Sequence, residues 1–345
     1  MSTARPVITA SNIETRSLRN LAANAGPVPA ILREDDVLDV CVNPDGLLWV
    51  NRLGHGFQCE GEFSSVDASL LLSGIATVRG LELNEHHPIL ETIFPLTGDR
   101  IEGLIPPVVT APAFAIRTRP KKIFTLREMA EQGVFTRKTD PLNQKRHRDN
   151  FLEKADGLDH VDVVELASIY RRNTLFVGPT GSGKTTGGNA IIADWLQQTP
   201  GDRVVIIEDT PELQCSIPNH LQLLATSRVS QAELLVAALR LIPKRIVVGE
   251  VRDTEPARVL IASWNTGHQG GIATIHADDA LSGLRKLESL IGAHDAAVRE
   301  RIAAAVGLVI FIDAEDSLPV GRKVREVVAV KGYDPARQDY DLIEL

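Results

Sequence analysis

The sequence predicts an α/β protein in which a smaller mixed α/β amino-terminal domain (residues 1–132) is joined by a linker (133–150) to a larger doubly wound α/β domain (151–345). The length of 345 residues suggests about two domains, at roughly 150 residues per domain. Hydrophobic residues make up 43% of the chain and charged residues 24%, as in ordinary soluble globular proteins. Beyond residue 174, apolar strand-like segments alternate with helical patterns, which predicts a largely parallel sheet covered on both faces.

The amino-terminal domain mixes helical and strand-like segments. A helical pattern covers residues 12–25, and residues 65–78 carry apolar positions at helical spacing after a serine. The sequence NPDG at residues 43–46 separates two short apolar stretches, and Asn, Pro, Asp and Gly are the residues that a tight hairpin needs. The strand-like segments of this domain are 37–42, 47–50, 89–94, 100–105 and 113–117.

The larger domain alternates strands and helices along the chain. A helix predicted to start at Lys184 is stopped by Pro200 and Gly201. The strands are predicted at 174–177, 203–207, 245–248 and 271–275, and the helices at 184–198, 231–241 and 255–264.

The linker and the overall charge limit the partners that the chain can bind. Residues 133–150 lose apolar periodicity and contain a proline and a cluster of basic side chains, which is typical of a solvated linker; contact with acidic lipid or nucleic acid is the alternative. Lys plus Arg number 37 against 45 Asp plus Glu, a net charge of −8, and only 4% of residues are aromatic. General or sequence-specific nucleic-acid binding is therefore not expected.

The cysteines and the hydropathy pattern predict a cytoplasmic protein. Cys41, Cys59 and Cys215 lie far apart and are odd in number, which fits reduced thiols. The amino terminus does not resemble a signal peptide, and no apolar run approaches the roughly 18 residues that would span a bilayer. Attachment to a membrane is therefore expected to be peripheral.

The strongest motif is GPTGSGKT, which lies between a predicted strand and a predicted helix, the context that a phosphate-binding loop requires. Its glycines let backbone N–H groups face phosphate oxygens, Lys184 reaches the β- and γ-phosphates, and Thr185 offers its hydroxyl to Mg²⁺. ATP is favoured over GTP because the chain has no N-K-x-D string. The predicted nucleotide-binding residues are Gly178, Pro179, Thr180, Gly181, Ser182, Gly183, Lys184, Thr185 and Thr186.

Acidic residues and histidines follow other predicted strands of this domain. Glu250 comes directly after the strand RIVV and a glycine, at a place suited to hold the water of a Mg²⁺ ion. Glu208 and Asp209 end another strand, where a carboxylate can orient the attacking water or the ion. His268 and His276 flank a short strand, and a histidine at a strand end can donate a hydrogen bond to a γ-phosphate.

Taken in order, GPTGSGKT, IIEDTPEL, RIVVGEVRD and TGHQGGIATIHA resemble the Walker A, Asp box, Walker B and His box of the traffic and secretion ATPases. This superfamily includes pilus-retraction, type II secretion and type IV secretion motors. NPDGLLWVNRLG, FAIRTR and WNTGH resemble the conjugal-transfer ATPases of the TrbB type. The resemblance runs from about Leu32 to the last strands, and it implies a RecA-like P-loop ATPase domain behind the amino-terminal domain.

The resemblance also implies roles for individual residues. Lys184 and Thr185 would bind phosphate and Mg²⁺, Glu250 would act in catalysis and hold the ion through water, and His276 would lie near the γ-phosphate. The further residues to which it implies a catalytic role are Glu208 of the Asp box, Arg117 and Arg119 of FAIRTR, and Arg240. In LRLIPKR, Ile242 and Lys244 depart from the family pattern, whereas Arg240 matches it.

As an assembly, the resemblance implies a homohexameric ring with ATP bound between the two domains, at the cytoplasmic face of the inner membrane. Its partners would be the membrane-embedded components of a conjugation or type IV secretion machine. A pilus assembly or retraction ATPase of the same superfamily is the close alternative. A RecA-like motor that grips DNA and a non-hydrolysing P-loop scaffold are the alternatives from other classes, and the second would leave Glu208, Glu250 and His276 without a purpose.

Overall fold

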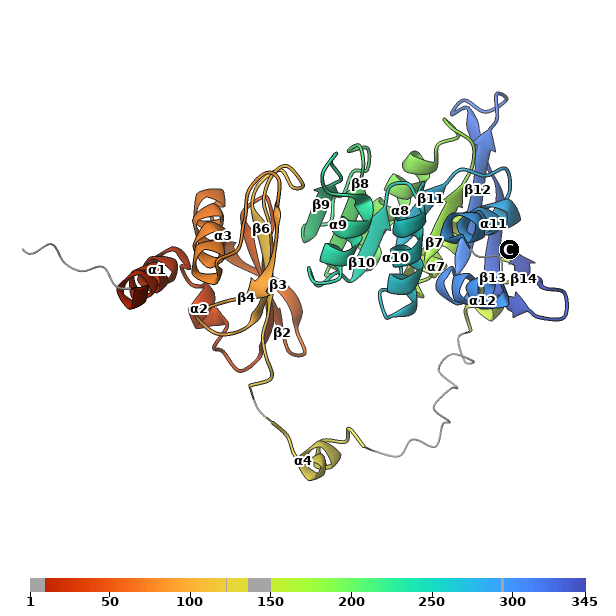
Figure 1. Ribbon diagram of the computed structural model, residues 1–345. Helices are drawn as coiled ribbons and strands as arrows, with labels where there is room; N and C mark the ends of the chain where they lie inside the picture. Colours follow the sequence, from red (N-terminus) through yellow and green to blue (C-terminus); the bar gives the residue numbers. More distant parts are fainter. Residues whose placement is uncertain (1–9, 122, 136–149, 293–294) are drawn as a thin grey trace, which may run out of the picture.

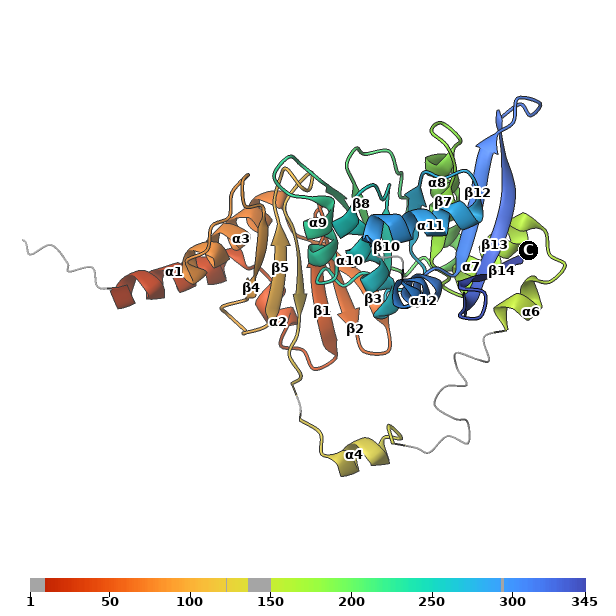
Figure 2. The ribbon, with the colours of Figure 1, turned by 45° about the vertical axis from the view of Figure 1, so that its right-hand side comes forward.

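The computed structural model describes residues 10–121, 123–135, 150–292 and 295–345 (Figure 1). Two sheets stand one behind the other along the molecule, each with its own helices (Figures 1 and 2). This arrangement confirms the predicted mixed α/β domain followed by a doubly wound domain. Most of the predicted linker lies outside the described residues. None of the helices in the described ranges is long and apolar enough to cross a membrane.

The amino-terminal sheet has six strands in the order β3-β2-β1-β6-β5-β4, with antiparallel neighbours. Five of these strands were predicted. The sixth, β3, was missed because all but one of its residues are exposed, so that it carries no apolar alternation. The strands are β1 (Val37–Val42), β2 (Leu47–Arg52), β3 (Gly56–Glu62), β4 (Ile89–Ile93), β5 (Arg100–Leu104) and β6 (Ala113–Arg117), and the helices of this part are α1 (Ala10–Asn24), α2 (Val28–Ile31), α3 (Ser65–Arg79) and α4 (Leu126–Glu131).

Both faces of the central strands β1 and β6 are largely buried, against different partners. Val40 and Phe114 point to the side where α1 and α3 pack, in one apolar cluster. Cys41 and Ala115, one position along on the same strands, belong to a second cluster shared with the carboxyl-terminal domain. Because successive side chains of a strand point to opposite faces, short runs such as AFAI are apolar throughout.

The carboxyl-terminal sheet has eight strands in the order β14-β13-β12-β7-β11-β10-β8-β9. The six strands from β12 to β9 are parallel, as predicted, whereas β13 and β14 form an antiparallel extension beyond β12. The sequence interpretation did not place β9, β12, β13 or β14. The strands are β7 (Thr174–Val177), β8 (Val204–Glu208), β9 (His220–Leu224), β10 (Arg245–Val248), β11 (Ile272–Ile275), β12 (Leu308–Ala314), β13 (Arg322–Asp334) and β14 (Asp339–Glu344).

Of the helices that lie over this sheet, three were predicted, and one of these ends earlier than expected. The other helices of this part, before residue 170 and after residue 279, were not predicted. The helix expected over residues 231–241 ends at Ala238, and Ile242 adopts a positive φ of 61° before Pro243. A residue that precedes proline is disfavoured in the helical region, so Ile242 lies beyond the end of the helix. The helices are α6 (Phe151–Ala155), α7 (His160–Ile169), α8 (Lys184–Gln198), α9 (Gln231–Ala238), α10 (Thr254–Asn265), α11 (Ala280–Ile291) and α12 (Ala296–Ala305).

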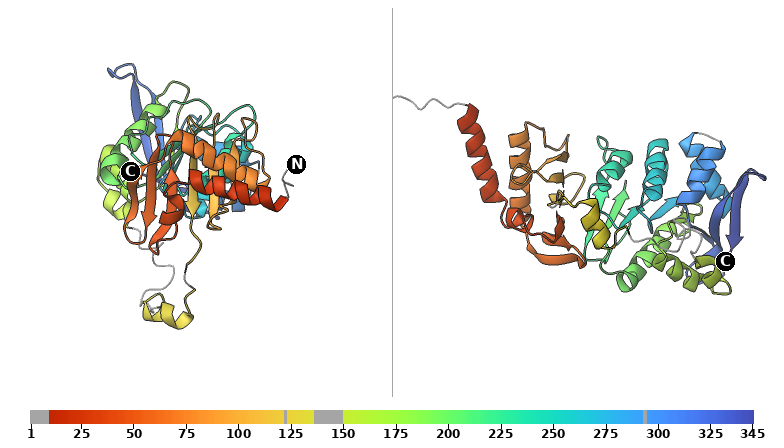
Figure 3. Two further views of the ribbon diagram at one scale, coloured as in Figure 1. Left: turned by 90° about the vertical axis from the view of Figure 1, so that its left-hand side faces the viewer. Right: turned by 90° about the horizontal axis from the view of Figure 1, so that it is seen from below.

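The two domains meet where the face of the amino-terminal sheet that lies opposite α1 and α3 covers β9 and α9 (Figures 1 and 3). The backbone N–H of Leu224 donates to the carbonyl of Val108, 2.9 Å away. The fully buried Arg203 donates to the Oδ1 atoms of Asn43 (2.7 Å) and Asn219 (2.5 Å). Asn43 belongs to the predicted NPDG turn, so this turn serves as a docking point between domains.

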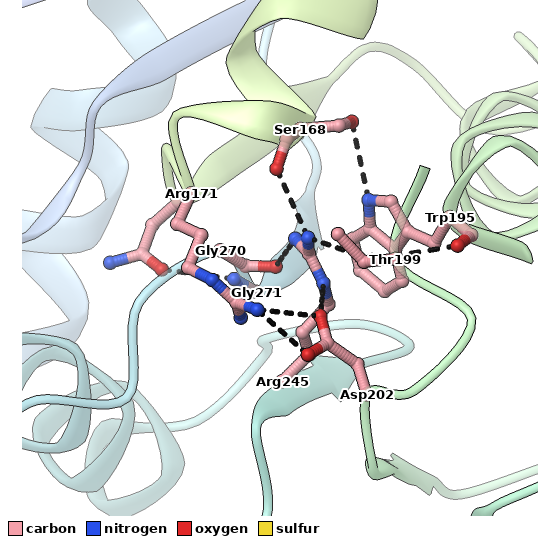
Figure 4. Close-up of polar contacts among 9 residues, drawn as sticks. Ser168, Arg171, Trp195, Thr199, Asp202, Arg245, Gly270 and Gly271 are labelled. Atoms are coloured by element: carbon pink, nitrogen blue, oxygen red, sulfur yellow. Dashed lines mark hydrogen bonds and ion pairs between the residues drawn. The ribbon is translucent and has the colours of Figure 1, made fainter. Parts of the chain in front are cut away.

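A buried polar cluster closes the carboxyl-terminal sheet at the amino ends of its parallel strands (Figure 4). Arg245 is fully buried, and its Nε donates to Asp202 Oδ2 at 2.8 Å. Its guanidinium also lies 4.4 Å from the centre of the Trp195 ring and donates to the carbonyls of Gly270 and Ser168. Asp202 and these carbonyls satisfy a charge that would otherwise be costly in the core.

Candidate active site

The GPTGSGKT loop connects β7 to α8 at the carboxyl end of the parallel strands. A Cβ atom on Gly178 would collide with the carbonyl oxygen of Ile312 on β12, so the loop packs directly against that strand. Gly181 and Gly183 have φ values of 78° and 99°, a region of backbone conformation that residues other than glycine rarely adopt. The loop thus leads directly into the amino terminus of α8, which begins at Lys184 as predicted.

The loop forms the floor of a cavity of about 450 Å³. Most of the nucleotide-binding residues predicted from the motif line it, together with both predicted glutamates and His276. Gly178, Pro179 and Ser182 are part of the loop but do not line the cavity. The cavity is lined by Thr180, Gly181, Gly183, Lys184, Thr185, Thr186, Glu208, Asp209, Thr210, Glu212, Gly249, Glu250, Arg252, Thr274, His276 and Arg322.

Three of these side chains form a chain of polar contacts. Lys184 Nζ lies 3.2 Å from His276 Nδ1, and His276 Nε2 lies 2.7 Å from Glu250 Oε1. The ammonium of Lys184 also donates to the carbonyls of Gly178 and Pro179, at 2.8 Å each. The strands β7, β10 and β11 end side by side, which brings residues 92 positions apart into contact.

Burial and neighbouring charges shift the pKa values of Glu250 and Lys184. Burial acts to raise the pKa of Glu250, but the hydrogen bond from Arg252 and the charges of His276 and Lys184 outweigh it and lower that pKa. Glu250 is therefore ionised near neutral pH. Burial lowers the pKa of Lys184, and the attraction of Glu250 opposes that shift.

Glu208 and Glu212, which both lie in the segment IIEDTPEL, make different contacts. Glu208 is 2% exposed, and its Oε1 accepts from the backbone N–H groups of Glu212 (3.0 Å) and Leu213 (2.9 Å), while its Oε2 accepts from Gln222. Glu208 thus holds the loop that follows it. Glu212, which the sequence interpretation missed, accepts from the Thr185 hydroxyl at 3.1 Å. The only signal for it was its place four residues after Glu208 in IIEDTPEL.

The three predicted arginines and His268 lie away from this cavity in the single chain. Arg117 pairs with Asp39 at 2.9 Å, and Arg119 donates to the carbonyl of Thr97 at 3.2 Å. His268 precedes β11 and so lies at the opposite end of that strand from His276. The roles predicted for these side chains stay predictions.

Arg240 contributes instead to the contact between the domains. Its Nη1 lies 2.6 Å from Glu91 Oε2 on β4. Glu91 stands opposite Glu102 in the register of β4 and β5, and Glu102 is 2% exposed. Burial raises the pKa of Glu102 to about 8; the positive charge of Arg240 opposes this shift and Glu91 adds to it.

The sequence and fold together define the class of protein. Residues 109–315 match the family described as Type II/IV secretion system protein, so the chain belongs to that family. The chain is 37% identical over 320 residues to the conjugal transfer protein TrbB of Rhizobium radiobacter, covering 92% of this chain and 91% of that protein. It is 36% identical over 332 residues to a probable TrbB of Sinorhizobium fredii, covering 96% and 94%.

A more distant relative and a solved structure are also similar to the chain. The type IV secretion system protein VirB11 of Bartonella quintana is 29% identical over 286 residues, covering 77% of this chain and 79% of that protein. The crystal structure of the VirB11 ATPase of Brucella suis, in complex with sulphate, has a TM-score of 0.80 at 24% identity and covers 91% of this chain and 96% of that one. The two TrbB proteins place the chain in the conjugation and type IV secretion branch of the family, and the crystal structure shows the same fold.

Proposed function

We propose that this protein hydrolyses ATP to ADP and phosphate and that the hydrolysis powers conjugative DNA transfer or type IV secretion. The observation that carries the proposal is the contact chain Lys184–His276–Glu250 over a glycine-rich phosphate loop. This contact chain supports the proposal because an ammonium group, an imidazole and an ionised carboxylate line one cavity large enough for a nucleotide. A nucleotide-binding scaffold would need only the first.

The residues of the cavity suggest a division of roles in hydrolysis. Lys184 binds the β- and γ-phosphates, His276 donates to the γ-phosphate, and the ionised Glu250 orients the attacking water and accepts its proton. The hydroxyl of Thr185 and the carboxylates of Glu212 and Glu250 line the same cavity, and oxygen ligands of this kind fit Mg²⁺. Thr185 would hold the ion directly and Glu250 through water, and the ion would offset phosphate charge.

The proposal extends to the assembly. The amino-terminal domain (1–132), the linker (133–150) and the ATPase domain (151–345) would form one subunit of a homohexamer, peripheral to the cytoplasmic face of the inner membrane. Its partners would be membrane components of the transfer machine. In such a ring Arg117 and Arg119 would complete a nucleotide site, since a guanidinium facing the γ-phosphate can be worth roughly 10³ to 10⁵ in rate.

The test is ATP turnover by the purified full-length chain, with light scattering in the presence and absence of ATP. Lys184→Ala should abolish turnover and weaken nucleotide binding, because it removes the contact to the transferred phosphate. Lys286→Ala, an exposed position on α11, is the matched control and should behave as wild type. Unchanged turnover in Lys184→Ala would refute the proposal.

A further inference from the structure

A cation outside all four sequence motifs lies across the phosphate loop. Arg322 is the first residue of β13, and its Nη1 donates to the hydroxyl of Thr186 at 2.7 Å. A Cβ atom built on Gly183 would approach both Cδ and Nη1 of this arginine to 2.6 Å, so the side chain lies directly against the loop. The Nε donates to the carbonyl of Val320 at 3.1 Å and fixes the direction of the guanidinium.

Arg322 forms no ion pair with the described residues of the chain. Arg252, the other arginine of the cavity, is bound to Glu250 at 2.5 Å. By contrast, no carboxylate of the described residues lies within ion-pair distance of the half-buried Arg322. Two of its five N–H donors are engaged, by a hydroxyl and a carbonyl. A planar guanidinium with spare donors beside a phosphate loop is suited to an anion.

The place of Arg322 on the loop selects the phosphates that it can reach. Lys184 extends toward His276 and Glu250, where the transferred γ-phosphate belongs. Arg322 is anchored at Gly183 and Thr186, at the start of α8, where the backbone cradles the α- and β-phosphates. We propose that Arg322 binds the α- and β-phosphates, the part of the nucleotide that ADP retains. This inference rests on the proposed function.

The consequence differs from that of the other cavity residues. An arginine that contacts only the retained phosphates stabilises bound ADP and bound ATP by the same factor. Arg322→Ala and Arg322→Gln should therefore each weaken the binding of ADP and of ATP about tenfold, the factor expected for one lost charge-assisted hydrogen bond. The ratio of the two affinities should stay within about twofold of wild type.

The experiment is equilibrium titration of the full chain with a fluorescent ADP analogue, followed by displacement with unlabelled ADP and with a non-hydrolysable ATP analogue. Arg325→Ala is the matched control, because Arg325 lies on the same strand but pairs with Glu315 outside the cavity. Circular dichroism and thermal unfolding of each variant verify the fold. The glutamine variant keeps a polar side chain and serves if the alanine variant is unstable.

Each outcome decides the inference. A similar loss for both nucleotides, with Arg325→Ala unchanged, supports it. Wild-type affinity for ADP in a folded Arg322 variant overturns it, and so does a loss confined to the ATP analogue. If the wild-type chain bound neither nucleotide, the proposed function would fall as well, which separates that failure from a failure of the role given to Arg322.

Discussion

The buried carboxyl of Glu102 should make the stability of this protein depend on pH in a direction opposite to that of most carboxylates. Glu102 lies on β5, on the face that the carboxyl-terminal domain covers, and one of its oxygens has no hydrogen-bond partner within the described residues. Burial raises its pKa from the usual 4.5 to about 8. Glu102→Gln keeps the shape of the side chain and removes its ionisation.

The size of the effect follows from proton linkage. Well below pH 4.5 the carboxyl is protonated in both the folded and the unfolded chain, so its ionisation does not affect stability. As pH rises toward 8, the carboxyl of Glu102 ionises in the unfolded chain but stays protonated in most of the folded chain. The unfolding free energy of the wild type therefore decreases. Between pH 5 and pH 8 the difference in unfolding free energy between Glu102→Gln and wild type should grow by about 3 kcal/mol in favour of the variant.

The assay is urea unfolding at pH 5, 6, 7 and 8, followed by circular dichroism and tryptophan fluorescence. Titrations elsewhere in the chain cancel when wild type and variant are compared at one pH. Glu62→Gln, an exposed carboxylate on β3, is the matched control and should give a constant difference. A difference for Glu102→Gln that is the same at pH 5 and pH 8 would refute the reasoning.

Three further predictions concern the cavity at the phosphate loop and the buried cluster around Arg245. Glu250→Gln should retain ATP binding while turnover falls by orders of magnitude, because only the charge that orients the water is lost; loss of binding would mean a structural role. His276→Ala should reduce turnover more mildly with affinity retained, and wild-type turnover would remove the γ-phosphate role. Asp202→Asn should lower the unfolding free energy at pH 7 by about 3 to 5 kcal/mol, since it leaves the fully buried Arg245 without its anionic partner; urea unfolding at wild-type stability would contradict this.

The sequence predicted those elements whose signal lies within a few neighbouring residues. Strands such as β7 and β10 are short and fully buried, and the phosphate loop needs glycines at fixed spacing. By contrast, the first five residues of β13 alternate between half-buried and exposed, and the position of this strand follows from pairing with β12.

The same limit applies to the site. Glu212 reaches Thr185 because Glu208 holds the intervening loop, a contact that depends on the folded geometry. Arg322 meets Thr186 across 136 residues of sequence, and only the strand order β13-β12-β7 brings the two together. No spacing rule links residues that a sheet brings together from distant segments.

The contact between Val108 and Leu224 has a consequence for the solution behaviour of the chain. β9 is the outermost parallel strand of its sheet, and an uncovered outer strand offers unpaired backbone groups to other chains, a common route to aggregation. The amino-terminal domain occupies this position with the Val108 carbonyl and an apolar layer around Leu221 and Leu223. A fragment starting at residue 151 would expose this strand and its apolar side chains together. The amino-terminal domain therefore covers an edge at which two carboxyl-terminal domains could otherwise pair strand to strand.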